Sequence, residues 1–96
     1  MSVAYARRAL SDIRAIAAYY AHSDNPQVGE RVAVRIREVV ARIARSPQSG
    51  RPVAERPGIR VAYLMRYPFN IFYAVTGDGV RILHIRHTSR HPWAGG

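Results

Sequence analysis

The chain has 96 residues, in which 15 basic side chains stand against 6 acidic ones, giving a formal net charge of +9. A chain of this length builds one hydrophobic core, so we expect a single domain over residues 1–96. The absence of cysteine excludes disulfide bridges and thiolate metal sites. The positive charge favours a polyanion or an acidic protein surface as the partner.

Every one of the 15 basic residues is arginine. Two interpretations are open: selection for planar, bidentate contacts with phosphate or carboxylate, or a codon bias of the source genome. The N-terminus lacks a signal-peptide core, and no apolar run approaches the roughly 18 residues that span a bilayer. We therefore expect a cytoplasmic protein without a membrane partner.

The N-terminal third predicts a strand followed by a helix. Residues 2–5 are expected to form a short strand that needs further strands as partners. From about Arg7, apolar side chains recur at spacings of three and four residues, which predicts an amphipathic helix ending near His22. Its apolar positions are Leu10, Ile13, Ile16 or Ala17, and Tyr20.

A second helix is predicted after residues 23–26, with Asn25 as its N-cap and Pro26 in its first turn. It should end at Ser46, because a following proline disfavours the helical conformation. Its apolar stripe consists of Val28, Val32, Ile36, Val39 and Ile43. The other side is expected to be solvated and carries Arg31, Arg35, Glu38, Arg42 and Arg45.

The C-terminal half predicts an antiparallel meander after a loop at residues 48–57, with a short extended piece at Val53 and Ala54. Three runs rich in Ile, Val, Tyr and Phe occupy residues 59–66, 69–75 and 80–87. The middle run is apolar at almost every position, so it should be central and covered on both faces. Arginine alternates with apolar residues in the outer runs, which predicts a cationic rim.

These elements predict an α+β fold of order β-α-α-β-β-β. Two helices joined by a turn of about four residues pack antiparallel, and their shared apolar face needs a sheet as its cover. We therefore expect an N-terminal strand and a two-helix antiparallel hairpin packed on a small antiparallel β-sheet.

This order of elements, together with several local sequences, resembles the ParE/RelE superfamily of toxins from bacterial type II toxin–antitoxin modules. The resemblance extends from about residue 3 to residue 92. The similar pieces are residues 9–16 with Tyr19-Tyr20, Asn25-Pro26, Ser46-Pro47, Gly50-Arg51-Pro52, Gly58-Ile59-Arg60, residues 67–73, and residues 80–87 with Arg90.

The resemblance implies a small cationic toxin that is neutralised by a cognate acidic or amphipathic antitoxin, ParD-like in this branch. ParE-like members are described as inhibiting DNA gyrase without chemistry of their own, whereas RelE-like members cleave messenger RNA on the ribosome. Residues 67–73 and 50–52 favour the ParE-like branch. We therefore expect a gyrase inhibitor that has no catalytic residues, no cofactor and no metal.

The alternative is a RelE-like, ribosome-dependent mRNA endonuclease. Metal-free RNA cleavage needs a base, an acid, and cations for the developing phosphorane charge. RelE-like toxins often supply lysines, which this chain lacks. Its catalytic group would be Arg66, Arg81, His87 and Arg90, with Glu55 as a conceivable base. A third alternative is a non-toxic basic nucleic-acid-binding module, which fits the charge but lacks the usual recognition motifs.

Seven residues of the strands and the tail are expected to bind the target, because folding can bring them onto neighbouring positions. They are Arg60, Arg66, Arg81, Arg86, His87, Arg90 and Trp93. Like charges directly opposed on a sheet repel, a cost that an anionic partner relieves. Trp93 is either the last side chain of the core or an anchor for a partner. We expect His84 to be packed or hydrogen-bonded, and Tyr19 and Tyr20 to lie in the core.

Overall fold

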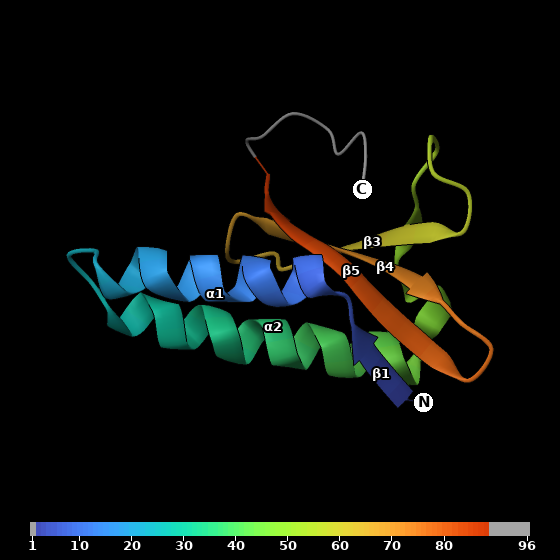
Figure 1. Cartoon of the computed structure of the whole chain (residues 1–96), viewed down its shortest axis with the longest axis horizontal. Coiled ribbons are helices and arrows are strands. Elements are labelled where there is room, and N and C mark those ends of the chain that lie inside the picture. Colours follow the sequence, from blue (N-terminus) through green and yellow to red (C-terminus); the bar gives the residue numbers. More distant parts are fainter. Residues whose placement is uncertain (1, 89–96) are drawn as a thin grey trace.

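The computed structural model describes residues 2–88, which form one sheet with two helices packed on it (Figure 1). The predicted β-α-α-β-β-β order is confirmed, with one short strand in addition. The elements are β1 (Ser2–Tyr5), α1 (Arg7–Ala21), α2 (Gln27–Arg45), the 3-10 helix η1 (Pro47–Ser49), β2 (Arg51–Pro52), β3 (Ile59–Tyr63), β4 (Phe69–Val75) and β5 (Gly79–His87). Within residues 2–88, neither helix has the length and apolar character of a membrane span.

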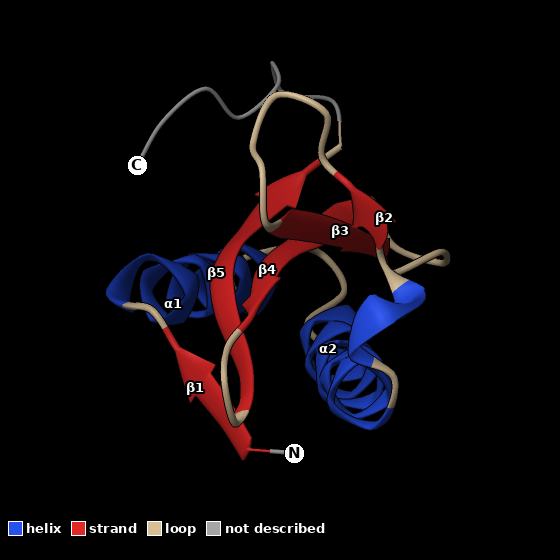
Figure 2. Ribbon diagram, turned by 90° about the vertical axis from the view of Figure 1, so that its right-hand side faces the viewer, coloured by secondary structure: helices blue, strands red, loops and turns tan. Residues whose placement is uncertain are grey.

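The sheet has the strand order β1-β5-β4-β3-β2. Strands β3, β4 and β5 form the predicted antiparallel meander, and β4 is its central strand. β1 lies parallel to β5. Parallel neighbours need a long crossover connection, which the helical hairpin and the rest of the chain provide. Figure 2 shows the strong twist of this sheet, with the two helices beside it.

The core lies between the helices and one face of the sheet. α2 buries its predicted stripe: Val32, Ile36, Val39 and Ile43 are each no more than 4% exposed. The two helices pack side by side (Figure 1). Because the apolar side chains of α2 recur on one side of the helix, they all meet the same layer of the sheet. This helix therefore supplies the largest continuous part of the core.

α1 contributes less to the core than its sequence predicts. Ala9 is its buried residue, while Ile13, Ile16 and Tyr20 pack against the cluster at its margin. Leu10 is 40% exposed, so its predicted place in the apolar stripe is wrong. A stripe through positions 9, 13, 16 and 20 also has spacings of three and four residues, which explains why periodicity could not separate the two alternatives.

The start of α2 differs from the prediction. No side chain caps this helix, and Pro26 already has a helical backbone conformation with φ −60° and ψ −26°. The carbonyl of Asn25 accepts a hydrogen bond from the amide of Val28 at 3.1 Å. The prediction that Asn25 caps α2 is therefore wrong, because a backbone turn takes the place of the side-chain cap.

A β-bulge reverses the alternation of β5. Tyr73 of β4 lies opposite Ile82, but Phe72 lies opposite His84, which leaves Leu83 as the extra residue. Ile82 and Ile85 consequently both face the core. A regular strand would place Ile82 and His84 on the same face, but the bulge puts His84 on the opposite face, with Phe72.

Two predicted boundaries also shift. β3 ends at Tyr63 rather than at residue 66, and a left-handed backbone conformation follows at Met65, with φ 71°. The amide of Leu64 still donates to the carbonyl of Phe69 at 3.1 Å, so the two strands close into a tight turn. The short extended piece is β2 at Arg51–Pro52, earlier in the chain than the predicted residues 53–54.

Candidate functional site

The guanidinium group of Arg60 is hydrogen-bonded within the fold. It lies opposite Tyr73 on the helix-facing side of the sheet. Its Nη1 donates to the carbonyls of Gly50 at 2.7 Å and Gln48 at 3.2 Å. The hydroxyl of Tyr73 accepts from the Gly50 amide at 2.8 Å and donates to the Pro47 carbonyl at 2.7 Å. Two side chains from adjacent strands therefore hold this loop in place.

The same contacts explain the sequence Gly50-Arg51-Pro52 in structural terms. A Cβ atom on Gly50 would collide with the ring and hydroxyl of Tyr73. Only glycine leaves room for the phenol at this position. Arg51 and Pro52 follow as an exposed edge strand, where the missing amide hydrogen of proline is tolerated.

A carboxylate of α1 accepts a backbone hydrogen bond at the edge of β5 that β1 leaves unpaired. β1 pairs with β5 only as far as Ile82. Beyond that point, Oδ2 of Asp12 accepts a hydrogen bond from the amide of Ile85 at 2.9 Å and lies 2.6 Å from Nδ1 of His84. The His84 ring also stacks on Phe72, with ring centroids 6.0 Å apart. His84 is thus packed and hydrogen-bonded, as predicted.

The structure does not gather the predicted target-binding residues into one patch. Arg81 lies opposite Ala74 and His87 lies opposite Phe69, at opposite ends of β5. Six residues of extended strand span roughly 20 Å, and the register places the two side chains on opposite faces of the sheet. Arg81 and His87 therefore cannot contact the same phosphate group.

The remaining candidates divide between the two ends of the sheet. Arg86 and His87 lie beside the turn between β3 and β4, which carries Arg66. The His87 ring packs edge-on against Phe69, with centroids 5.4 Å apart. Glu55 lies in the loop that precedes β3, at the end of the sheet nearer Arg81. Arg90 and Trp93 lie outside the described residues.

A groove between α2 and the β3–β4 turn brings together charged residues that the sequence analysis did not predict to be neighbours. It has a volume of about 720 Å³, and two of its lining residues, Arg66 and Tyr67, come from the turn. The other wall is formed by residues of α2 that follow one another at spacings of three and four, and so lie on one side of the helix. They are Gln27, Glu30, Arg31, Val34, Arg35 and Glu38.

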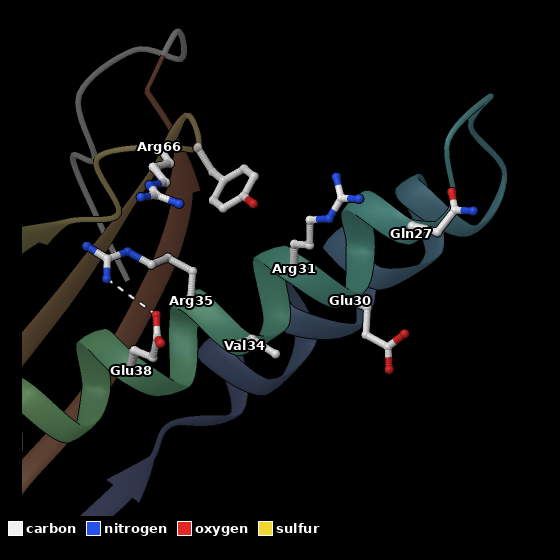
Figure 3. A pocket seen from close by; sticks show the side chains of 8 residues that line it. Gln27, Glu30, Arg31, Val34, Arg35, Glu38 and Arg66 are labelled. Atoms are coloured by element: carbon white, nitrogen blue, oxygen red, sulfur yellow. Dashed lines mark hydrogen bonds and ion pairs between the residues drawn. The ribbon is translucent and has the colours of Figure 1, made fainter.

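Arg35 ties the two walls of this groove together. Its Nε donates to the carbonyl of Leu64 at 3.0 Å, and its Nη1 lies 3.4 Å from Oε1 of Glu38. Figure 3 shows Arg35 and Arg66 approaching each other from the two walls, with Arg31 further along α2. The prediction that this side of α2 is solvated is therefore wrong for Arg35, whose side chain is hydrogen-bonded to Leu64, the residue that follows β3.

Burial raises the pKa of Tyr20 above its usual value of 10.0, and its neighbours Tyr19 and Tyr67 raise it further. Tyr20 packs against the core, as predicted. Tyr19, in contrast, is 71% exposed and meets Tyr20 edge-on at 5.1 Å. The prediction that Tyr19 lies in the core is wrong.

Within residues 2–88, no cluster of three or more His, Asp or Glu side chains is arranged to hold a metal ion.

Residues 3–92 match the family described as the ParE toxin of the type II toxin–antitoxin system parDE. The chain belongs to the ParE toxin family. A solved structure described as the chromosomal ParDE toxin–antitoxin system from P. aeruginosa is similar, with 31% sequence identity and a TM-score of 0.80. That match covers 93% of this chain and 97% of the other.

A second similar structure is that of the isolated E. coli RelE toxin, with 17% sequence identity to this chain and a TM-score of 0.56. The match covers 94% of this chain and 86% of that chain, and it shows a likeness of fold alone. No individually curated protein gives a match.

The sequence of this ParE toxin did not predict the groove, because the two walls of the groove come from separate elements, α2 and the β3–β4 turn. The spacing of Arg31 and Arg35 was visible in the sequence, but it is equally typical of a solvated helix face. The decisive contact, from Arg35 to the Leu64 carbonyl, joins residues that lie far apart in the chain. No local pattern signals such a contact.

Proposed function

We propose that this ParE-family toxin inhibits DNA gyrase in the cytoplasm, and that a cognate ParD-like antitoxin, acidic or amphipathic, neutralises it. The observation that carries the proposal is the family match over residues 3–92. The similarity to a solved ParDE system at 31% identity supports it. Inhibition of this kind needs a binding surface rather than an assembled catalytic group.

The geometry supports inhibition over RNA cleavage. A base and an acid must lie within hydrogen-bond reach of the same reacting group. Glu55 and Arg81 lie toward one end of the sheet, while Arg66 and His87 lie toward the other. The described members of the predicted nuclease group are therefore not assembled around one phosphate.

The proposed target-binding surface is the end of the sheet at the β3–β4 turn. Arg66, Arg86 and His87 lie there, and Arg86 and His87 precede the tail that carries Arg90 and Trp93. We keep all five as the proposed contact residues. Arg81 is exposed but lies at the other end of the sheet, and Arg60 is bonded to the loop after α2. Neither adjoins this surface.

The test adds purified protein separately to DNA gyrase with plasmid DNA and to a translating ribosome with messenger RNA. We expect loss of supercoiling or trapped double-strand breaks in the first assay, and uncut message in the second. Cut message without an effect on gyrase would overturn the proposal in favour of the RelE-like endonuclease.

A pair of variants locates the surface in the same gyrase assay. Arg86→Ala removes a charge beside the turn, and Arg37→Ala removes an exposed charge from α2. We expect Arg86→Ala to weaken inhibition about tenfold, within the range measured for interfacial charge pairs, and Arg37→Ala to change it little. Equal effects of both variants would show that net charge alone drives the inhibition.

A further inference from the structure

The turn between β3 and β4 presents an apolar side chain to solvent. Met65 is 77% exposed, more than any other large apolar side chain of residues 2–88. It is also the one non-glycine residue in that range with a positive φ, at 71°. A left-handed backbone is costly for a residue with a Cβ atom, whereas glycine or asparagine adopts it more readily. Neither burial nor backbone preference therefore accounts for methionine at this position.

The backbone around Met65 is tightly bonded. The amide of Arg66 donates to the carbonyl of Leu64 at 2.8 Å, which makes Met65 the central residue of a three-residue γ-turn. A γ-turn with a positive φ is the rare and strained type. Strain of this kind persists only where the surrounding structure imposes it, and it is concentrated at functional sites.

The neighbours of Met65 and Arg66 hold the turn in place. Leu64 is fully buried, and its carbonyl also accepts a hydrogen bond from Nε of Arg35 at 3.0 Å. Tyr67 packs against the core cluster. Because the backbone of Met65 lies between two anchored residues, it loses little conformational entropy when a partner binds. Its unbranched side chain can still adapt to the shape of a pocket.

A second feature at the same end of the sheet also lowers stability. Asn70 of β4 lies opposite Tyr63 on one side and opposite Arg86 on the other. Among the described residues, its Oδ1 atom is buried and has no hydrogen-bond partner, which costs free energy. Places where a folded chain departs from such local rules are expected to be functional. Two independent departures therefore coincide at the end of the sheet that carries the β3–β4 turn.

We propose that Met65 is the apolar anchor of the toxin on its target, where it enters an apolar pocket of the target protein bordered by carboxylates. Arg66 follows Met65 in the chain, and Arg86 lies at the same end of the sheet, so both guanidinium groups can pair with such carboxylates. Methionine, arginine and tyrosine are enriched at protein interfaces, and Tyr63 is also exposed here. The inference rests on the proposed function, because it names a contact that inhibition requires.

The arrangement of the arginines favours a protein pocket over DNA. An apolar side chain that enters DNA has to unstack two base pairs, and phosphate contacts over a wide surface offset that cost. Here Arg81 lies at the other end of the sheet, and Arg60 is bonded to the loop after α2. The charge beside Met65 is therefore local, as a pocket on a protein surface requires.

The decisive variant is Met65→Gly, because the inference predicts that activity falls while stability does not. Glycine relieves the positive φ, so we expect the melting temperature to stay the same or to rise by up to about 5 °C. The anchor is lost, so we expect the concentration that half-inhibits purified gyrase to rise about tenfold or more. A residue that only supported the fold would lower stability and activity together.

Two further variants complete the set. Met65→Leu restores an apolar side chain of similar volume, and we expect it to regain most of the inhibition that Met65→Gly loses. Leu10→Ala shortens an exposed apolar side chain in the first turn of α1, outside the β3–β4 turn. We expect Leu10→Ala to change the inhibitory concentration by less than about twofold, as for a residue outside the interface.

Expression of the same variants in bacterial cells separates this inference from the proposed target. If the parent chain arrests growth but leaves purified gyrase active, the proposed function is wrong. The growth of cells that contain Met65→Gly at the same soluble level then decides the inference. Restored growth would support the anchor at another target, and continued arrest would overturn it.

In the gyrase assay, three results would overturn the inference. The first is full inhibition by Met65→Gly. The second is a loss in Met65→Leu as large as that in Met65→Gly, because the pocket would then not recognise apolar surface. The third is an equal loss in Leu10→Ala, which would assign the effect to surface hydrophobicity in general. A lower melting temperature in Met65→Gly would also overturn it, by assigning the methionine to the fold.

Two binding measurements on the purified chain exclude other occupants of the turn. Weaker binding of Met65→Gly to plasmid DNA without gyrase would assign Met65 to DNA. A parent chain that elutes as a dimer in size-exclusion chromatography, and a Met65→Gly variant that elutes as a monomer, would assign it to a contact between two copies. Either result would overturn the inference, and we expect neither.

Discussion

Arg60 and Arg66 belong to one predicted strand and carry the same charge, yet they use it differently. Arg60 donates to the carbonyls of Gly50 and Gln48, beside the hydroxyl of Tyr73. Arg66 lies past the end of β3 and lines an open groove. The difference shows that abundant arginine does not itself make a binding surface, because position relative to unpaired backbone carbonyls decides how each charge is used.

The largest expected effect tests the Arg60 region. Tyr73→Phe removes one oxygen that both accepts from the Gly50 amide and donates to the Pro47 carbonyl. The Gly50 amide is then left buried without a partner, which costs about 1–3 kcal/mol for each such group. We expect the free energy of unfolding, measured by urea titration, to fall by about 2–4 kcal/mol.

The matched control is Tyr63→Phe, because Tyr63 is 38% exposed on the opposite face. We expect a change within about 0.5 kcal/mol, as for most surface substitutions. If both tyrosine variants unfolded at the same urea concentration as the parent, the loop after α2 would not depend on the Tyr73 hydroxyl.

A smaller effect separates the two arginines directly. Arg60→Gln loses charge-assisted bonds to two carbonyls, so we expect the free energy of unfolding to fall by about 1–2 kcal/mol. Arg66→Gln should leave stability within about 0.5 kcal/mol. Thermal melts of the two variants measure both outcomes. A stability loss in Arg66→Gln equal to that in Arg60→Gln would remove the contrast.

The smallest effect is a pH dependence at Tyr20, whose pKa is raised by burial and by neighbouring Tyr19 and Tyr67. The unfolded chain ionises this phenol first as the pH rises past 10.0. Stability from its burial is therefore complete below that pH and is lost as the pH rises through the higher pKa of the folded state. We expect Tyr20→Phe to lose less stability above that pH than the parent, in urea titrations across the alkaline range.

Much of the fold followed from periodicity in the sequence. The apolar stripe of α2 and the three apolar runs of the meander predicted the helical hairpin, the sheet and the central place of β4. Each of these signals is local and repeats several times, so single exceptions do not change the result. The bulge at Leu83 lacked such a signal, because one extra residue depends on how two strands pair and not on either strand alone.

The candidate site was less predictable, because its contacts join distant parts of the chain. The sequence identified the arginines, but not that Arg60 would reach two carbonyls or that Arg35 would reach Leu64. The side chain of Asn25 was expected to cap α2, and a backbone turn does so instead. In each case the partner is a backbone group, whose position is known only once the chain is folded.

The carboxylate of Asp12 has a consequence for the free chain. β1 covers only part of β5, and an uncovered strand edge is where another chain can add its own strand and begin aggregation. With the Ile85 amide bonded to Asp12 and α1 lying alongside, a foreign strand would first have to displace a helix. The molecule thereby discourages copies of itself from joining edge to edge.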